Sequence, residues 1–321
     1  MYTRADFDRA LTIVYSAMPP TPQYAWPLLA EETQCECWVK HENHTPIGAF
    51  KVRGGLVHMR LRKERGETNG VITATRGNHG QSIPFAARRE GIAATVVVPQ
   101  GNSTEKNAAM RALGCTLIEG GSDFDEARDT AIRLAMERGL DMVASFHPEL
   151  VMGVATYAYE LFSAAGELDA VYVPIGLGSG ICGVISMRDM LGLKTKVIGV
   201  VAERANAYAL SFAQGRAVPT NSAASFADGM AVRVPNADAV AMINRGAERI
   251  VEVSEDEIAE AMRLYYRATH NLAEGAGAAA LAALMKERPQ MKGKRVGLIL
   301  SGGNIDGAKF AQVLQGRTPL P

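Results

Sequence analysis

Residues 170–183 read Ala-Val-Tyr-Val-Pro-Ile-Gly-Leu-Gly-Ser-Gly-Ile-Cys-Gly, an apolar run followed by a turn with three alternating glycines. The run is apolar throughout, which is typical of a strand whose sheet is covered by helices on both faces. Glycines after such a strand let the backbone approach a phosphate, and the following helix points its free N–H groups at it. Dinucleotide-binding proteins share this pattern, and Glu203 follows the next strand, where their ribose-binding acid stands. The segment alone therefore predicts a phosphate-binding turn in an α/β fold, with NAD as one candidate ligand.

Apolar runs alternate with amphipathic stretches on both sides of this segment. The runs expected to form strands are 71–74, 94–99, 115–119, 170–174, 196–202 and 295–301. The stretches expected to form helices include 50–65, 104–113, 124–138, 153–166 and 255–271. Ser254 and Glu257 have the spacing of a capping box in front of the last of these. The alternation predicts mainly parallel sheets, and any two domains are expected to be interleaved rather than in series.

The composition excludes several classes of partner. The 321 residues contain 34 basic and 34 acidic side chains, so neither nucleic acid nor an anionic membrane is expected as a partner. No stretch approaches the ~18 apolar residues of a membrane span, and no signal or transit peptide begins the chain, which favours a cytoplasmic protein. Four cysteines are too few for a disulfide framework. Cys35 and Cys37, two apart on a strand, are expected to be structural residues rather than metal ligands.

Residues 48–55 read Gly-Ala-Phe-Lys-Val-Arg-Gly-Gly and place Lys51 beside an aromatic ring where a helical pattern begins. Desolvation and the positive end of the helix dipole both lower the pKa of a lysine in such a place. A neutral amine can attack an aldehyde and form a Schiff base. Taken alone, however, the segment is better explained by a solvated lysine on a helix surface.

Residues 75–80 read Thr-Arg-Gly-Asn-His-Gly and directly follow the predicted strand 71–74. They bring hydroxyl, amide and imidazole groups into a turn that leads to a helix. Free N–H groups at a helix start suit a carboxylate. Taken alone, the segment is better explained by a polar turn with a helix cap, so it does not decide a function by itself.

In combination, these segments resemble the serine/threonine ammonia-lyases, namely the threonine dehydratases and serine racemases among the fold-type II pyridoxal-phosphate enzymes. Residues 40–55 resemble the cofactor-lysine motif of that family, 77–80 its asparagine loop and 176–180 its phosphate-binding loop. Residues 226–232, 272–278 and 300–304 follow in family order, so the resemblance runs from about Thr21 to the end of the chain. It implies two interleaved three-layer α/β/α domains of the tryptophan synthase β-like kind. Residues 1–69 plus 148–321 would form a large cofactor-binding domain, and 70–147 a small mobile domain that closes over the substrate.

The resemblance also implies a cofactor, pyridoxal 5′-phosphate, and a role for each matching residue. Lys51 would carry the cofactor as a Schiff base and act as the catalytic base, with Phe50 and Asn78 beside the ring. The phosphate would be held by Gly176, Leu177, Gly178, Ser179 and Gly180. The substrate carboxylate would be bound by Thr75, Arg76, Gly77, Asn78 and His79. Ser301 would face the pyridine nitrogen, and a neutral hydroxyl there leaves the nitrogen largely unprotonated, which favours β-elimination over transamination.

The sequence departs from the family pattern in four places. Ala49 replaces a usual serine, and Leu177 replaces a common glycine although leucine does not readily adopt a positive φ. Thr75-Arg76 replaces a pair of serines. Because arginine stays protonated it cannot act as the second base of a racemase, so elimination is expected rather than racemisation. At the family's cation site Glu203 and Ala207 match, but Ala209 replaces an acid, so a divalent metal is expected to be absent or weakly bound.

We therefore expect β-elimination of a β-hydroxy amino acid, such as L-threonine or L-serine, to a 2-oxo acid and ammonia, in a homodimer. Arg76 permits recognition of a second acidic group, as in 3-hydroxyaspartate, whereas the changes at Ala49 and Thr75 permit a bulky side chain, as in phenylserine. Two alternatives stay open: a β-replacement synthase of the same fold and, from another class, an NAD-binding protein. Because the chain ends soon after its last expected helix, we expect no C-terminal regulatory domain and a catabolic role.

Overall fold

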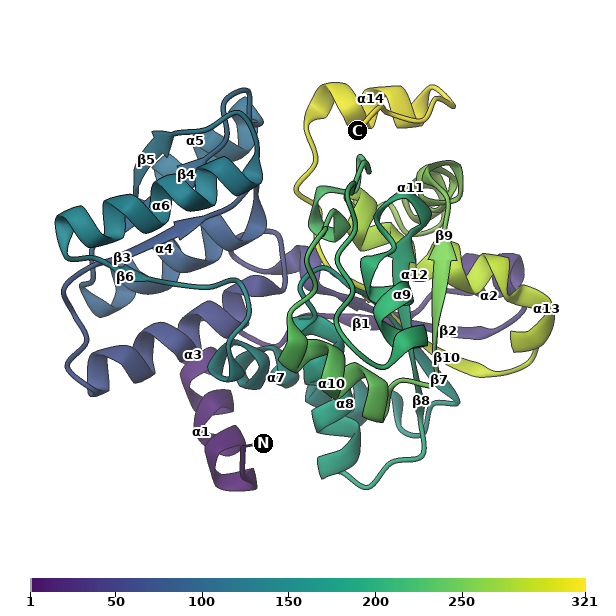
Figure 1. Cartoon of the computed structure of the whole chain (residues 1–321). Coiled ribbons are helices and arrows are strands. Elements are labelled where there is room, and N and C mark those ends of the chain that lie inside the picture. The colour runs from purple at the N-terminus through teal and green to yellow at the C-terminus, as the bar shows by residue number, and fades with distance from the viewer. Residues whose placement is uncertain (1) are drawn as a thin grey trace. The chain divides into compact units, whose positions relative to one another are not determined.

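The computed structural model describes residues 2–321, which divide into two compact units (Figure 1). The first unit contains Pro20–Phe50 and Val154–Pro321, and the second contains Tyr2–Pro19 and Lys51–Gly153. The units are interleaved, as expected, but their bounds differ from the ranges 1–69 plus 148–321 and 70–147. Helix α3 (Lys51–Glu64) groups with the second unit because it packs against α1 (Arg4–Tyr15) and α4 (Asn78–Glu90).

The first unit is built on a six-stranded sheet with the order β1-β2-β10-β7-β8-β9. Its strands are β1 (Gln23–Ala25), β2 (Glu36–His41), β7 (Ala170–Pro174), β8 (Lys196–Ala202), β9 (Arg249–Val253) and β10 (Arg295–Leu300). Strands β1 and β2 pair antiparallel, and every other neighbouring pair is parallel. Parallel neighbours bring the carboxyl ends of β7, β8 and β10 to one edge, where ligands bind in such sheets.

Helices cover both faces of this sheet. The helices of the first unit are α2 (Pro27–Thr33), α8 (Ser179–Met190), α9 (Ala207–Gln214), α10 (Ala237–Gly246), α11 (Glu255–Thr269), α12 (Gly275–Lys286), α13 (Arg288–Met291) and α14 (Gly307–Leu314). Three 3-10 turns, η1 (Glu42–His44), η2 (Glu203–Ala205) and η3 (Asp228–Met230), complete it, and α7 (Pro148–Ala165) crosses the division at Gly153. Alternate strand residues such as Tyr172 and Val200 share one buried cluster with α11 and α12, and α8 packs on β7 and β8. Cys35 and Cys37 are free thiols buried in that cluster.

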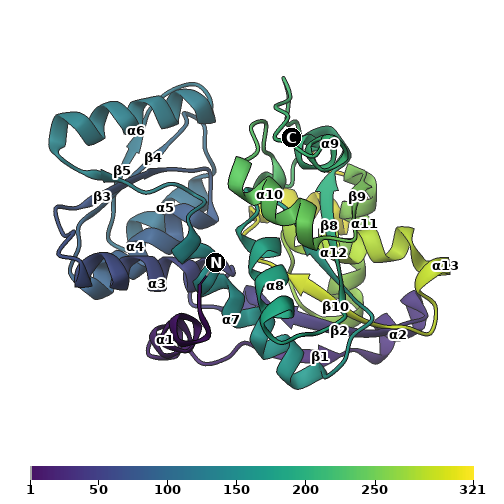
Figure 2. The ribbon, with the colours of Figure 1, turned by 60° about the horizontal axis from the view of Figure 1, so that its bottom comes forward.

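The second unit has a four-stranded, fully parallel sheet with the order β5-β4-β3-β6. Its further elements are β3 (Val71–Ala74), β4 (Ala94–Val98), α5 (Thr104–Ala112), β5 (Thr116–Glu119), α6 (Phe124–Arg138) and β6 (Asp141–Met142). Alternation along β4 separates the two faces: Val97 packs with α6, whereas Val96 and Val98 pack with Met110 of α5. Figure 2 shows α6 and α4 on opposite sides of these strands. Both units therefore have the expected three-layer α/β/α arrangement.

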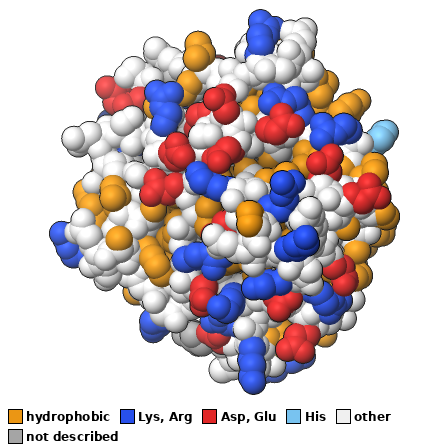
Figure 3. All heavy atoms as spheres, turned by 90° about the vertical axis from the view of Figure 1, so that its right-hand side faces the viewer, with side chains coloured by type: hydrophobic (Ala, Val, Ile, Leu, Met, Phe, Trp, Pro, Cys, Tyr) orange, Lys and Arg blue, Asp and Glu red, His pale blue; other side chains and the backbone are white. Residues whose placement is uncertain are grey.

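The surface carries charges of both signs. Figure 3 shows Lys and Arg side chains interspersed with Asp and Glu on one face, as the balanced composition predicts. Within residues 2–321, no helix combines the length and the apolar character that crossing a membrane requires.

Candidate active site

Two backbone segments far apart in the sequence meet where β10 ends. Ala49 and Gly302 form an antiparallel bridge, and the Phe50 N–H donates to the Ser301 carbonyl at 3.0 Å. Gly48 adopts a positive φ of 68°, and a Cβ there would lie 2.7 Å from Oδ1 of Asn304. The structure therefore brings together Phe50 and Ser301, two of the expected cofactor-binding residues.

The glycine turn after β7 leads directly into α8. Gly178 precedes the helix with φ +99° and provides no side-chain cap, so the N–H groups of the first turn have no side-chain acceptor there. A Cβ on Gly176 would lie 2.3 Å from the Gly229 carbonyl oxygen. Leu177 does not adopt a positive φ, whereas Gly178 does. The substitution of leucine is thus accommodated without backbone strain.

Two tyrosines that the sequence did not single out hold this turn. The Tyr208 hydroxyl donates to the Leu177 carbonyl at 2.9 Å, and the Tyr157 hydroxyl donates to the Gly180 carbonyl at 3.0 Å. Tyr157 also contacts the Phe50 ring edge to face, with centroids 6.0 Å apart. A Cβ on Gly180 would lie 3.7 Å from Cζ of Phe50, so the glycine turn and the Phe50–Ser301 contact are neighbours. Burial raises the pKa of Tyr208, so its hydroxyl stays protonated as a donor.

Lys51 is the first residue of α3 and begins the longer of the two stretches of the second unit. Its carbonyl accepts a hydrogen bond from the Ser82 hydroxyl of α4 at 2.6 Å. A Cβ on Gly55 would lie 2.3 Å from that hydroxyl oxygen, so α3 and α4 approach as closely as they do because Gly55 has no side chain. The positive charge of Lys51 is also felt by the buried ring of His79.

The expected substrate-binding turn lies between β3 and α4. The Gly77 N–H donates to the Thr75 hydroxyl at 3.0 Å, and Gly77 precedes α4 without a side-chain cap. His79 is buried, and burial, followed by the charge of Lys51, lowers its pKa to about 3. Its ring has a hydrogen bond with the Val143 backbone, but its Nε2 has no partner among the described residues. Arg76 is exposed and makes no hydrogen bond or ion pair with any residue from 2 to 321.

The weak metal candidates lie elsewhere in the first unit. Glu203 begins η2 and Ala207 begins α9. The Glu203 carboxylate lies 3.3 Å from the ammonium nitrogen of Lys286, which also donates to the Glu252 carbonyl and lies 3.2 Å from Glu257. A lysine ammonium therefore already neutralises the one acid that matched the family's cation site.

The expected residues thus form two groups, one in each unit. Phe50, Ser301 and the turn 176–180 come together in the first, and Lys51 lies near the turn 75–79 in the second. Their chemistry fits pyridoxal phosphate: α8 begins with uncapped N–H groups suited to a phosphate, a serine directly follows β10, and a lysine is the first residue of α3. The unpartnered Nε2 of buried His79 is a further polar atom that a ligand can satisfy. Glu274, which belongs to the segment 272–278, is buried in the first group, with Oε1 2.6 Å from a Cβ placed on Gly302.

Comparisons with known proteins agree with this chemistry. Over 307 residues the chain is 33% identical to the L-threonine ammonia-lyase of Thermotoga maritima, covering 95% of this chain and 76% of that protein. Over 297 residues it is 32% identical to an L-threo-3-hydroxyaspartate ammonia-lyase of Pseudomonas sp, covering 92% and 93%. The solved structure of processed threonine deaminase isoform 2 from Solanum lycopersicum has a TM-score of 0.90 at 29% identity, covering 98% of this chain and 94% of that one. The chain spans 58% of the length of three biosynthetic threonine dehydratases that it also matches.

The family described as pyridoxal-phosphate dependent enzyme matches residues 14–302, a range that contains both groups of candidate residues. That range includes Lys51, the turn 75–79, the turn 176–180 and Ser301. The chain therefore belongs to the pyridoxal-phosphate dependent enzymes, and pyridoxal phosphate is its cofactor.

Proposed function

We propose that this chain is an ammonia-lyase that eliminates the β-hydroxyl of an amino acid to give a 2-oxo acid and ammonia. The observation that carries the proposal is the contact between Phe50, the neighbour of Lys51 in the chain, and Ser301 at the end of β10. A serine near the pyridine nitrogen cannot hold that nitrogen charged as a carboxylate does. A weaker electron sink favours prompt loss of a leaving group from the β-carbon.

The phosphate of the cofactor would be held by backbone N–H groups of the turn 176–180 at the start of α8. Tyr157 and Tyr208 support this role because their hydroxyls fix the carbonyls of Gly180 and Leu177. With those carbonyls held, the N–H groups of the turn have a defined direction. Pyridoxal phosphate supplies an electron sink for the electron pair that remains on the α-carbon after proton removal.

Lys51 would hold the cofactor through its amine and then, once released, accept the α-proton of the substrate. To act as a base the released amine would have to be neutral, and its place at the first residue of α3 would favour that form because the N-terminal end of a helix is positive. His79 stays neutral near Lys51 because burial lowers the pKa of its ring to about 3. The uncapped start of α4 would bind the substrate carboxylate through backbone N–H groups.

Replacement of Lys51 tests this proposal. We expect Lys51→Ala to lose at least about 10³-fold in kcat for 2-oxo acid release from L-threonine or L-serine, because it lacks both the attachment point and the base. Lys63→Ala, on the same helix with a half-exposed side chain, is the matched control and should keep its activity. A Lys51→Ala enzyme as active as the control would refute the assignment.

The product distinguishes elimination from the alternative β-replacement chemistry. An ammonia-lyase releases ammonia and a 2-oxo acid in equal amounts, whereas a synthase forms a new β-substituted amino acid when a thiol is supplied. The NAD-binding alternative is not retained, because the chain belongs to the pyridoxal-phosphate dependent enzymes.

Arg76 favours a second candidate substrate, a β-hydroxy amino acid with an acidic side chain. Its guanidinium is exposed, next to the turn proposed to bind the carboxylate, and has no partner among residues 2–321. A guanidinium binds a carboxylate through two parallel hydrogen bonds. One relative, the Pseudomonas enzyme, is named for L-threo-3-hydroxyaspartate.

Comparison of substrates tests the role of Arg76. We expect Arg76→Ala to lower kcat/KM for 3-hydroxyaspartate by about 10- to 100-fold, since a charge-assisted hydrogen bond contributes roughly 1.5–3 kcal/mol. The values for threonine and phenylserine should change by less than about threefold, and Arg138→Ala at the exposed end of α6 should change none of them. Equal losses on all three substrates would remove the second-carboxylate idea.

A further inference from the structure

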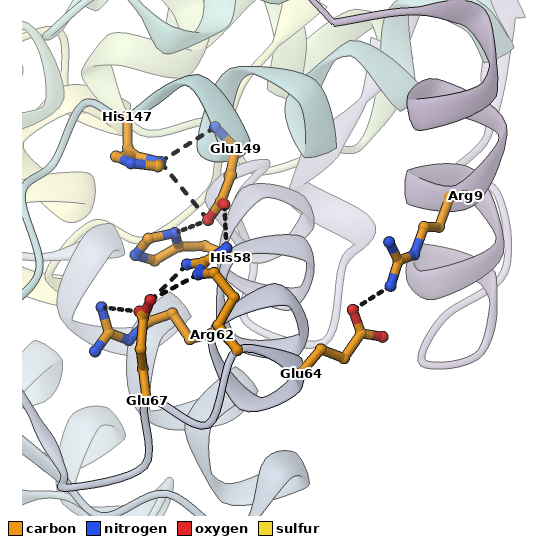
Figure 4. Close-up of polar contacts among 8 residues, drawn as sticks. Arg9, His58, Arg62, Glu64, Glu67, His147 and Glu149 are labelled. Carbon is orange, nitrogen blue, oxygen red and sulfur yellow. Dashed lines mark hydrogen bonds and ion pairs between the residues drawn. The ribbon is translucent and has the colours of Figure 1, made fainter.

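Two histidines and a glutamate of the second unit form a cluster (Figure 4), and none of them is among the candidate cofactor or substrate residues. His58 lies in the middle of α3, Glu149 in the first turn of α7, and His147 two residues before Glu149. Each offers one ligand atom, and the three atoms all lie within 4.8 Å of one another. The proposed reaction uses none of these three side chains.

The nitrogens converge on one carboxylate oxygen. His58 Nδ1 lies 2.6 Å from Oε2 of Glu149, and His147 Nδ1 lies 3.7 Å from the same oxygen. The centroids of the two imidazole rings are 4.7 Å apart. The Glu149 N–H donates to His147 Nδ1 at 3.2 Å, so that nitrogen carries no proton, and an ion bound there would replace this hydrogen bond. Ligand atoms of a tetrahedral zinc ion lie roughly 3.3 Å apart at metal–ligand distances of about 2.0 Å, so small side-chain rotations suffice.

The surroundings orient the glutamate and leave a negative balance of charge. Arg65 donates to Oε1 of Glu149 at 2.6 Å, which leaves Oε2 facing the imidazoles. Arg65 and Arg62 also pair with Glu67, and Arg62 pairs with Asp141. Two guanidiniums thus face three carboxylates, and the excess of one negative charge suits a cation. Such outer partners fix the direction of a metal-ligating carboxylate.

We propose that His58, His147 and Glu149 bind a divalent transition-metal ion of the zinc class. Two imidazole nitrogens and one carboxylate oxygen are a ligand set for zinc, whereas magnesium and calcium prefer oxygen ligands alone. The ion takes the place of the proton that His58 donates to Glu149, and that proton leaves to solvent. Three protein ligands leave a fourth position for water.

The three side chains of the cluster differ in solvent exposure, so an ion can reach the site from the exposed side. The side chain of His58 is 6% exposed, that of Glu149 18% and that of His147 43%. His147 is therefore the ligand at the surface, and His58 is the inner one. Because His58 belongs to α3 and Glu149 to α7, the ion ties the middle of α3 to the first turn of α7. An ion that binds only to the folded state stabilises that state against unfolding.

Zinc titration of the holoenzyme tests the site. The protein is first treated with a chelator, then titrated with Zn²⁺ in competition with a chromophoric chelator, and its thermal midpoint is recorded with and without Zn²⁺. We expect one ion per chain, a raised midpoint, and an affinity at least about tenfold lower in His147→Gln. X-ray absorption of the bound ion should show nitrogen and oxygen ligands without sulfur, which separates this site from the four free cysteines.

His270→Asn is the matched control, because His270 is exposed and asparagine tolerates its φ of +56°. It should bind Zn²⁺ as the unchanged chain does. His58→Gln, a second variant that keeps a polar group beside Glu149, should weaken binding as His147→Gln does. Binding of equal strength in His147→Gln, sulfur ligands on the ion, or no stoichiometric Zn²⁺ at all would overturn the proposal.

Discussion

His41 and His79 are both buried histidines, one in each unit. Burial, joined by the charge of His44, lowers the pKa of His41 to about 4, and the Trp26 indole donates to its Nε2 at 3.0 Å. Burial and then the charge of Lys51 lower the pKa of His79 to about 3. Both rings are therefore neutral in the folded protein at any pH at which the enzyme is expected to work.

These neutral rings predict a loss of stability in mild acid. In the unfolded chain a histidine has a pKa near 6.5, so between about pH 6.5 and 4 the unfolded state binds more protons than the folded state. The stability contribution is complete above pH 6.5 and declines as the pH falls. We expect the free energy of unfolding to fall by about 2 kcal/mol per buried histidine between pH 7 and pH 5.

His41→Gln isolates one of these contributions, because glutamine accepts from Trp26 but does not titrate. Urea unfolding at pH 7 and pH 5 should show that the variant loses about 2 kcal/mol less than the unchanged chain over this range. A variant with the same pH dependence would contradict the assignment.

Single residues show where sequence patterns stop being informative about the site. Lys51, Asn78 and Ser301 stand in motifs that identify the family. Tyr157 and Tyr208 stand in no such motif, because each acts on a turn contributed by a distant part of the chain. Their roles follow from hydrogen bonds and close approaches that only the folded backbone creates.

At the scale of elements, two glycines with positive φ flank α8, Gly178 directly before it and Gly192 two residues after it, and the two differ in their surroundings. A Cβ on Gly178 (φ +99°) would lie 2.7 Å from Cβ of Ala239, whereas one on Gly192 (φ +65°) would meet nothing within 4 Å. Alanine at either position is strained by its backbone conformation alone. Only Gly178 adds crowding beside the proposed phosphate-binding turn.

Alanine variants of these two glycines distinguish the effect of backbone strain on stability from an effect on cofactor binding. Gly192→Ala should lower the free energy of unfolding by about 1 kcal/mol and leave cofactor affinity unchanged. Gly178→Ala should be at least as unstable and should also bind pyridoxal phosphate at least about tenfold more weakly, measured by fluorescence titration of the apoenzyme. Equal cofactor affinities of the two variants would argue against a phosphate site at this helix start.

The elements that the sequence predicted best have both a clear period and clear ends. Helix α6 matches its predicted bounds 124–138, and the capping box of Ser254 and Glu257 is present at the start of α11. Helix α12 was not predicted, because its run of small apolar residues is buried all round and has no polar face. Strand β9 was missed because only Val251 and Val253 are buried, too few for a recognisable run.

At the scale of the whole molecule, a buried ion pair joins the two stretches of chain that make up the first unit. Lys40 of β2 lies 2.5 Å from Glu160 of α7, and both side chains are almost fully buried. The ammonium also donates to the Thr21 carbonyl and to Gln23. Since 103 residues, from Lys51 to Gly153, separate the two stretches, this pair fixes a contact distant in sequence.

Removal of one partner of this ion pair should therefore lower the free energy of unfolding strongly. Lys40→Met leaves a buried carboxylate without its cation and should lower the free energy of unfolding by about 3–5 kcal/mol. Lys196→Met, which breaks the exposed pair with Glu248, is the control and should change it by less than about 1 kcal/mol. The double variant Lys40→Met, Glu160→Leu should recover part of the loss, and urea unfolding measures all three. An effect of Lys40→Met as small as that of the control would show that the pair does not stabilise the unit.

The interleaving could be expected from the sequence, whereas the contacts that group α3 with the second unit could not. Family order and alternating patterns indicated that one part of the chain is inserted in another. The division at Phe50 and Lys51 falls without any linker, since the glycines nearby serve local turns and close helix packing. The assignment of α3 to the second unit depends on its packing against α1 and α4, which no local pattern encodes.

The crowded glycines of the first unit affect how natural variation in this chain is interpreted. A methyl group on Gly277 would lie 2.3 Å from the carbonyl oxygen of Gly302, and one on Gly302 would lie 2.6 Å from the Glu274 carboxylate. A screen that selects only for folded protein will already reject side chains at both positions. Invariance at residues 277 and 302 in a set of homologues will thus report on steric exclusion, and it will not by itself mark either glycine as a contact of the cofactor.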